Sequence, residues 1–235
     1  MLQHADAAFP SGGFAFSNGI EGLASLGLPL SGIDLSNALA VSIRHRWAGT
    51  DRVALINAYR AGSDSVALNR IDAALEAATL AEPMRTGSKR NGQSLLAAHA
   101  RLGTPGADDL RKSVQTGRLL GHLAVIQAVL WQALGIGERE AVLMSGYQAA
   151  SSMTAAAVRL GQVGAIDAQR SLADALVVIA EIAERPVNVG LTNKGLTDQD
   201  LAEKPEDAIV LTSFIPFIEI AAMRNAEADL RLFAN

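Results

Sequence analysis

Apolar side chains recur along most of this chain at the three- to four-residue spacing of an amphipathic α-helix. Val66, Ile71 and Leu75 fall on one face if the chain turns about once every 3.6 residues, as an α-helix does. Similar spacing predicts a short helix over 17–26 and longer helices over 35–46, 52–59, 65–80, 84–102, 110–134, 139–160 and 167–185. The pattern therefore predicts a chain in which helix follows helix.

Glycine, proline and capping residues indicate where these helices begin and end. Asp34 or Ser36 is the expected cap of the second helix. A loop over 104–109 is expected before the first of the two longest helices, and Gly-Ile-Gly at 135–137 joins these two helices. A linker this short favours antiparallel neighbours.

Two prolines divide the last part of the chain. Pro186 ends the helix before it, and the segment 186–204 is predicted to be an exposed, polar connection. The segment 207–232 has a helical pattern again, and Pro216 is expected to bend or divide it, because proline cannot donate a hydrogen bond within a helix.

The composition supports one all-α domain, a bundle of roughly eight to ten helices. Hydrophobic residues make up 49% of the chain, enough to offset the conformational entropy lost on folding. Aromatic residues are only 4%, and small and aliphatic side chains favour closely packed helices over a sheet. We expect the domain to span 1–235, with a Gly- and Phe-rich N-terminal segment (1–28), the exposed connection (186–204) and a C-terminal tail (229–235).

The charges argue against several classes of function. The formal net charge of -4 provides no overall attraction to nucleic acid, and the basic groups at 44–46 and 85–90 are interpreted as solvated helix faces. The chain has no cysteine, which excludes disulfides, thiolate metal sites and cysteine nucleophiles. No export signal is visible at the N-terminus, so a cytoplasmic location is expected.

Two stretches without charged residues, 119–137 and 141–158, approach the length of a membrane span. They contain polar side chains such as His122, Gln127 and Gln148, which would be costly in lipid. We therefore predict two mostly buried helices and no membrane contact.

No sequence motif indicates catalysis. The segment 87–94 has the glycine spacing of a phosphate-binding loop, but Gln93 stands where lysine is needed. The four histidines are too far apart in sequence to pair on one helix face, and no Gly-x-Ser-x-Gly elbow occurs. A helical enzyme with a cofactor pocket between 110–134 and 139–160 stays open as the alternative hypothesis.

Four segments resemble the UreF family of urease accessory proteins. Residues 2–21 match the order and spacing of the family's opening, which runs roughly Leu-Gln-Leu-x-Asp-Ser, then Pro-x-Gly-Gly-Phe, Ser and Gly-Leu-Glu. Arg159-Leu160-Gly161-Gln162 resembles a later Leu-Gly-Gln segment of the family. Ser213-Phe214-Ile215-Pro216 and the terminal Arg231-Leu232-Phe233 resemble its end.

The resemblance implies a non-enzymatic partner protein. Members of this family form homodimers, bind the accessory protein UreD, also called UreH, and with it recruit the GTPase UreG to apo-urease. Nickel then passes to the urease active site. The resemblance thus implies a scaffold for nickel insertion that binds no cofactor tightly, with nickel and GTP handled by its partners.

The resemblance also implies partner-binding residues. Phe14 and Phe16 are either interface anchors or core aromatics, and Glu21 is either a contact to the GTPase or a surface helix charge. Residues 231–233 either become ordered on binding UreD/UreH or pack against their own domain. The expected partner-binding residues are Gly12, Gly13, Phe14, Phe16, Ser17, Gly19, Glu21, Gln162, Arg231, Leu232 and Phe233.

Overall fold

Helices provide the regular secondary structure of this protein, which confirms the prediction of an all-α domain. The computed structural model describes residues 2–6, 9–11, 13, 16–27, 30–187, 209–227 and 232–233. Within these ranges nine α-helices have seven or more residues, in agreement with the predicted eight to ten. The elements are α1 (Leu2–Ala5), α2 (Ile20–Ser25), α3 (Gly32–Ser42), the π-helical turn η2 (Ile43–Trp47), α4 (Asp51–Ala61), α5 (Ser65–Ala78), α6 (Glu82–Arg101), α7 (Ala107–Gln115), α8 (Leu123–Ala133), α9 (Glu138–Arg159), α10 (Ala165–Ala183) and α12 (Pro216–Ala226).

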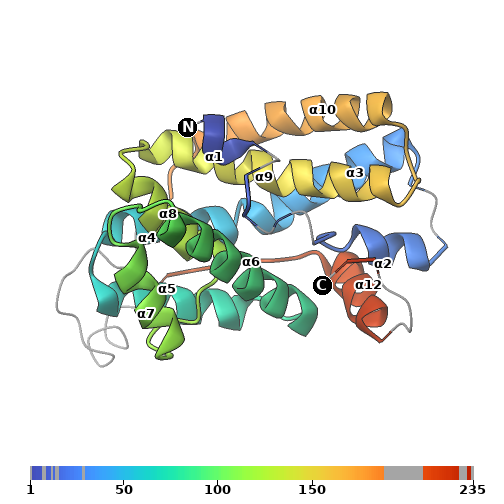
Figure 1. The fold of residues 1–235 in the computed structure, drawn as a ribbon. Helices are drawn as coiled ribbons and strands as arrows, with labels where there is room; N and C mark the ends of the chain where they lie inside the picture. Colours follow the sequence, from blue (N-terminus) through green and yellow to red (C-terminus); the bar gives the residue numbers. More distant parts are fainter. Residues whose placement is uncertain are drawn as a thin grey trace.

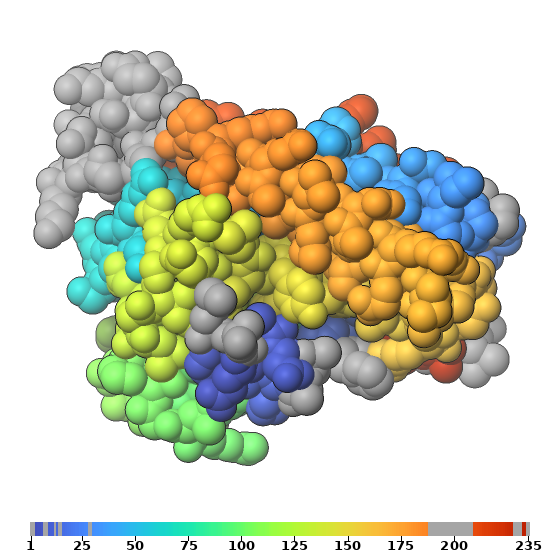
Figure 2. All heavy atoms as spheres, turned by 90° about the horizontal axis from the view of Figure 1, so that it is seen from above, coloured from blue at the N-terminus to red at the C-terminus, as the bar shows by residue number. Residues whose placement is uncertain are grey.

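The helices pack around one apolar core. α10 packs against α9 and α3, and α8 packs against α4 and α6 (Figure 1). α5 packs on α4, α7 packs on α6, and α12 pairs with α2 at the other end of the molecule. The short α1 lies on the outside of α9 (Figure 2). Trp47 and Trp131 are the largest fully buried side chains of the core.

The single helix predicted over 110–134 is wrong, because a turn interrupts it. α7 begins at Ala107, inside the predicted loop 104–109, and α8 begins only at Leu123. The periodic apolar pattern continues through the turn because the turn is itself partly buried, with Leu119 in the core. Periodicity alone could not separate the two helices.

The turn before α8 is held by Asp72 of α5. This fully buried carboxylate accepts the N–H groups of Leu120, Gly121 and His122 at 2.7, 2.8 and 3.1 Å. Buried backbone donors must find acceptors, and here a side chain from another helix supplies them. Asp72 therefore fixes the path of the chain into α8.

α3 begins with a reciprocal cap at Ser31, so neither predicted cap, Asp34 or Ser36, was correct. Ser31 Oγ accepts the N–H of Asp34 at 3.5 Å, and the Asp34 carboxylate accepts the N–H of Ser31 at 3.1 Å. Asp34 is thus the third helical residue and the second half of a capping box.

Within the described residues 209–227, the predicted helix over 207–232 is correct for α12 but not for the residues before it. Residues 209–215 are not helical and lie beside η2 in space. The N–H of Phe214 donates to the carbonyl of His45 at 2.8 Å. Pro216 has no N–H to donate, so it fits the first turn of a helix and marks where α12 begins.

α8 and α9 contain the two uncharged stretches, and both are core helices. Val125, Ile126 and Trp131 of α8 are fully buried, as are Ala141 and Ala150 of α9. Among the helices that the structure describes, none is both long and apolar enough to cross a membrane.

A small aromatic cluster attaches the N-terminal segment to α6. The buried ring of His99 stacks on His4 with ring centroids 5.1 Å apart, and it contacts Phe9 at 5.3 Å. Nδ1 of His99 lies 2.9 Å from Thr104 Oγ1. Burial, together with the nearby His4, lowers the pKa of His99 to about 4.

We expect the protein to lose stability as the pH falls from about 7 towards about 4. His99 titrates near 4 in the folded state, whereas an unfolded histidine titrates near about 6.5. Between these two pH values the unfolded chain therefore binds more protons than the folded protein, and the free energy of unfolding decreases as the pH is lowered. Urea denaturation at pH 7, 6 and 5 measures the loss. His99→Asn keeps a polar atom near the Nδ1 position and does not titrate, so an equally large loss in this variant would contradict the assignment.

Candidate functional site

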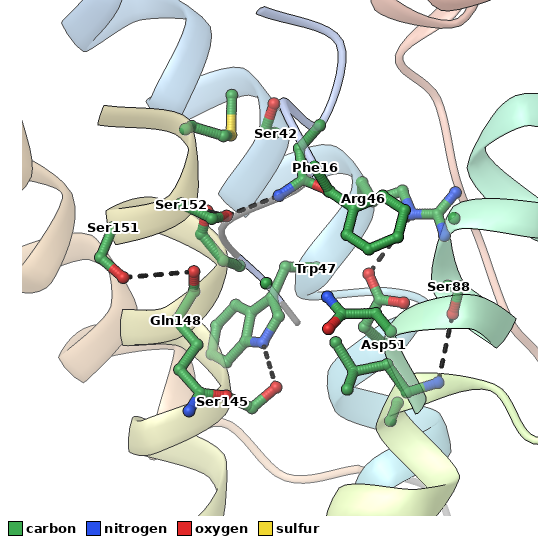
Figure 3. A pocket seen from close by; sticks show the side chains of 18 of the residues that line it. Phe16, Ser42, Arg46, Trp47, Asp51, Ser88, Ser145, Gln148, Ser151 and Ser152 are labelled. Atoms are coloured by element: carbon green, nitrogen blue, oxygen red, sulfur yellow. Dashed lines mark hydrogen bonds and ion pairs between the residues drawn. The ribbon is translucent and has the colours of Figure 1, made fainter. Parts of the chain in front are cut away.

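A pocket of about 200 Å³ opens between η2, α6, the start of α8 and the second half of α9. Residues of the N-terminal segment, including Phe16, complete its wall (Figure 3). Most of the wall is apolar and includes Trp47, Met84 and Met153. Polar side chains from four elements, among them Ser42, Arg46, Ser88 and Ser152, also line it.

The π-helical turn determines which residues of this region face inward. The N–H of Ala48 donates to the carbonyl of Ile43, five residues earlier, instead of four as in an α-helix. The wider turn changes the direction in which its side chains point. Such π-helical turns are frequent at functional sites. Arg44 and His45 stay exposed as predicted, but Arg46 is only 8% exposed, so the interpretation of 44–46 as a solvated face is wrong for Arg46.

Trp47 forms one side of the pocket. Its indole N–H donates to Ser145 Oγ of α9 at 3.2 Å. A Cβ atom on Gly146 would lie 2.8 Å from a ring carbon of Trp47, so only glycine allows the ring to pack this close to α9. The glycine in an otherwise helical pattern is thus explained by contact with a residue far away in sequence.

Ser88, at the edge of the pocket, belongs to a hydrogen-bonded chain through His122 to Glu76. His122 Nδ1 lies 3.1 Å from Ser88 Oγ, and His122 Nε2 lies 2.7 Å from Glu76 Oε2. Ser88 Oγ also accepts the N–H of Leu123, the first residue of α8, at 3.2 Å. These hydrogen bonds between Ser88, His122 and Glu76 therefore connect α5, α6 and the start of α8, and Ser88 serves as a cap for α8.

The protonation states of His122 and Glu76 follow from their surroundings. Burial lowers the pKa of His122 despite the opposing charges of Asp72 and Glu76. Burial alone would raise the pKa of Glu76, but hydrogen bonds from Lys89 and His122 lower it below its usual value. At neutral pH a neutral His122 donates from Nε2 to the Glu76 carboxylate and accepts the Ser88 hydroxyl at Nδ1.

Three of the predicted site residues lie at or beside the pocket. Gly13 and Phe16 line it, and Ser17 is fully buried next to Phe16. Phe16 is 6% exposed, so its ring is packed inside the domain, as the core-aromatic interpretation expects, while its role as an interface anchor stays a prediction.

Gly19 and Glu21 lie elsewhere, at the junction of α2 with the C-terminal part of the chain. Gly19 has a φ of 88°, and a Cβ there would collide with Ile218 of α12. Glu21 is buried, and its carboxylate accepts Asn225 Nδ2 at 3.0 Å and the N–H of Leu232 at 2.5 Å. The interpretation of Glu21 as a surface charge is therefore wrong, because the carboxylate is used inside the molecule to hold the end of the chain.

The end of the chain is partly packed and partly exposed. Phe233 is buried, and the guanidinium of Arg159 lies 4.3 Å above its ring. Leu232 is 73% exposed. Phe233 thus packs against its own domain and Leu232 is accessible, while the binding of this segment to UreD/UreH stays a prediction. Gln162 lies exposed in the turn after α9.

The other predicted positions lie outside the described residues. These are Gly12, Phe14 and Arg231, together with most of the connection predicted over 186–204 and most of the tail predicted over 229–235.

The phosphate-loop spacing at 87–94 has no loop to support it, since these residues lie inside α6. Among the residues that the structure describes, no three His, Asp or Glu side chains are arranged so that they could hold a metal ion. The alternative hypothesis placed a cofactor pocket between 110–134 and 139–160. The observed pocket is lined from both stretches, by the first turns of α8 and by the second half of α9, together with η2, α6 and the N-terminal segment. Its volume is below the roughly 300–1,000 Å³ of typical ligand sites.

Sequence reasoning missed the pocket residues Ser42, Arg46 and Asn91. Nothing in the local pattern distinguishes Arg46 from its exposed neighbours, because the π-helical turn has no sequence signature that we could use. The one available signal was the unbroken apolar pattern on both sides of Arg44, His45 and Arg46.

An apolar face along α12 is the second surface feature. Phe217, Ile220 and Met223 are 55%, 49% and 43% exposed and recur every three residues, so they lie on one side of α12. Phe214, which is 75% exposed, extends this face beyond the start of the helix. The opposite side of α12 packs on α2. We call Phe214, Phe217, Ile220 and Met223 the α12 face.

The fold and these sites define an all-α protein with a small, mostly apolar pocket and an exposed apolar helix face. A family model described as UreF matches residues 32–176, more than half of the chain. The chain therefore belongs to the UreF family, a family of accessory proteins rather than enzymes, as the sequence resemblance implied.

Relatives match over the whole chain. A urease accessory protein UreF of Trichodesmium erythraeum is 27% identical over 241 residues, covering 100% of this chain and 95% of the relative. A urease accessory protein UreF 1 of Brucella melitensis is 28% identical over 238 residues, covering 100% and 91%. A urease accessory protein UreF of Yersinia enterocolitica is 27% identical over 239 residues, covering 100% and 96%.

Proposed function

We propose that this protein is a scaffold of the urease nickel-insertion machinery, which acts in the cytoplasm as a homodimer. It binds UreD/UreH and, with it, recruits or gates the GTPase UreG on apo-urease. Nickel and GTP are handled by these partners, and the chain itself binds no cofactor tightly. Membership of the UreF family supports the accessory role.

The observation that carries the binding role is the α12 face. Four large apolar side chains, three of them on consecutive turns of one helix, are costly to leave in water and are typical of a protein-binding surface. An amphipathic helix with regularly spaced apolar side chains fits a groove on a partner. Leu232, exposed beside the buried Phe233, is available to the same partner. We assign the α12 face to UreD/UreH.

Phe217→Glu combined with Ile220→Glu is expected to weaken binding to UreD/UreH by about 30-fold or more, the size of effect that hot-spot residues produce. Both side chains are about half exposed, so the helix content of the protein should not change. Isothermal titration calorimetry with purified UreD/UreH measures the affinity, and urease activation in cells measures the consequence.

Val66→Glu and Val177→Glu are the matched controls. Both valines are exposed, on α5 and α10, and both variants should bind UreD/UreH as the unaltered protein does. If the α12 variant bound with unchanged affinity, the assignment of this face would be refuted. If the unaltered protein bound neither UreD/UreH nor UreG, the proposed scaffold function itself would be refuted.

A further inference from the structure

Ser88, His122 and Glu76 form a hydrogen-bonded series that the scaffold role does not use. The Ser88 hydroxyl lies 3.1 Å from His122 Nδ1, and His122 Nε2 lies 2.7 Å from a Glu76 carboxylate oxygen. A hydroxyl, an imidazole and a carboxylate in this order are a serine nucleophile, its base and the group that orients the base. We call these three residues the Ser88 relay.

The imidazole of His122 has the proton arrangement that a base needs. In most serine hydrolases Nε2 faces the serine and Nδ1 faces the carboxylate, whereas here the two nitrogens are exchanged. Because Nε2 donates to Glu76, the lone pair of a neutral His122 is on Nδ1, the nitrogen beside the Ser88 hydroxyl. Burial lowers the pKa of His122 despite the opposing charges of Asp72 and Glu76, so Nδ1 can accept a proton at neutral pH.

The close packing of α6 on the turn before α8 brings Ser88 to His122. Gly92 lies one turn after Ser88 on α6, and a Cβ atom on Gly92 would collide with the carbonyl of Gly121. Only glycine therefore allows α6 to come this close. His122 follows Gly121 directly and is fully buried, so water does not compete with Ser88 for Nδ1. The Ser88 relay is thus held between packed helices.

The Ser88 relay adjoins the pocket at the start of α8. Ser88, Leu123 and Ala124 all line the pocket, and Ser88 Oγ accepts the N–H of Leu123 at 3.2 Å (Figure 3). This is the electropositive end of α8, where the first N–H groups have no acceptor within the helix. The N–H of Ala124 belongs to the same turn. Negative charge on a carbonyl oxygen beside Ser88 is favoured in this place, as in an oxyanion hole.

We propose that Ser88 is a nucleophile that short-chain carboxylic esters acylate, with His122 as its base and Glu76 as a positioning residue. The pocket next to Ser88 has a volume of about 200 Å³, which suits a short acyl chain and not a long one. Its wall is mostly apolar and includes Met84 and Met153, so it favours an acyl group without charge. This activity is separate from the binding of UreD/UreH.

The reaction requires only the ester and water. Ser88 Oγ bonds to the carbonyl carbon while its proton passes to His122 Nδ1, and the tetrahedral intermediate expels the alcohol, which takes this proton. Water then attacks the acyl-serine in the same way, which releases the carboxylic acid and restores the hydroxyl. Glu76 retains the hydrogen bond from Nε2 throughout and stabilises the imidazolium that forms in each step.

A fluorophosphonate probe tests the nucleophile in the unaltered protein. Such probes bond covalently to activated serines, and peptide mass spectrometry locates the modified residue. Labelling is expected at Ser88 and not at Ser152, which lines the same pocket but donates its hydroxyl to the carbonyl of Ala149 at 3.0 Å. Incubation with p-nitrophenyl butyrate should place a butyryl group on Ser88 as well. An unlabelled Ser88, or equal labelling of Ser152, would overturn the proposal.

Ser88→Ala tests the same assignment by rate. It is expected to slow the release of p-nitrophenol from p-nitrophenyl butyrate by at least about 100-fold. Circular dichroism checks its fold, because the substitution also removes the acceptor of the Leu123 N–H. Ser94→Ala, at an exposed position on α6 away from the pocket, should react as the unaltered protein does. Equal rates in folded Ser88→Ala and Ser94→Ala would refute the proposal. The assay uses the chain alone, so its outcome does not depend on UreD/UreH.

The pH profile distinguishes a positioning role of Glu76 from a structural one. The charged groups around His122 are Asp72 and Glu76 of α5 and Lys89 of α6. The acylation rate should rise with pH as His122 loses its proton, with a midpoint below about 6.5, the ordinary histidine pKa. Glu76→Gln removes a negative charge that favours the proton, so the midpoint should move to lower pH and the plateau should fall by roughly tenfold or more. An equal loss of rate at every pH would contradict this role.

Discussion

Asp72→Ala is expected to lower the free energy of unfolding by about 4 kcal/mol, the largest effect of any single substitution considered for this protein. The substitution leaves three backbone N–H groups at the entry to α8 without an acceptor, and those of Gly121 and His122 are buried while that of Leu120 is partly buried. Leaving a buried donor unpaired costs about 1–3 kcal/mol, and donors to a charged group lie at the upper end. Urea denaturation followed by circular dichroism measures the loss.

Two further variants serve as controls for Asp72→Ala. Asp72→Asn keeps one acceptor oxygen at the same place and should recover part of the stability. Asp109→Ala, at a carboxylate that is 87% exposed and bonded only to Lys112 on its own helix, should change the free energy of unfolding by less than about 0.5 kcal/mol. An Asp72→Ala protein as stable as Asp109→Ala would show that the turn before α8 does not depend on this carboxylate.

Gly22→Ala is expected to separate α12 from α2 and to destabilise the protein by about 3 kcal/mol. A Cβ atom on Gly22 would lie 2.5 Å from the carbonyl carbon of Ala221 and 3.0 Å from the nitrogen of Ala222. These are backbone atoms, which cannot turn aside as a flexible side chain could, so the two helices must move apart. Hydrogen exchange should show faster exchange of α12 amides than in the unaltered protein.

The displacement of α12 should also weaken the proposed binding of UreD/UreH to the α12 face. The α12 face is positioned by the packing of α12 on α2, so Gly22→Ala should weaken UreD/UreH binding although it replaces no exposed residue. Gly164→Ala is the control, since a Cβ there meets nothing within 4 Å and its backbone needs no positive φ. Unchanged exchange of α12 amides in Gly22→Ala would contradict this account of the junction.

Much of the fold could be predicted from local patterns, and the errors have a common cause. The helix that contains Ile71 and Leu75 follows from their spacing, since an apolar stripe at helical period must be buried on one side. The same rule extended one helix from 110 to 134, because the buried turn between α7 and α8 is apolar as well. The backbone N–H groups of this turn donate to Asp72, which lies 50 residues away from His122 in sequence.

The candidate sites were less predictable than the fold. Gly19 and Glu21 were found through the family resemblance, but their roles at the α2–α12 junction were not. Arg46 was interpreted as exposed, because its burial depends on a π-helical turn and on Thr79, 33 residues further along the chain. A pattern read over a few residues carries no information about such partners.

The sequence by itself determined that this chain is all-helical and a member of the UreF family, because helical period and family motifs are carried by neighbouring residues. Only the tertiary structure decided which polar groups are buried and what they contact. Glu21 holds the N–H of Leu232 across 211 residues, and the pocket gathers side chains from the N-terminal segment to α9. The burial of a charged or polar group is set by partners that folding brings together, and these partners are distant in sequence.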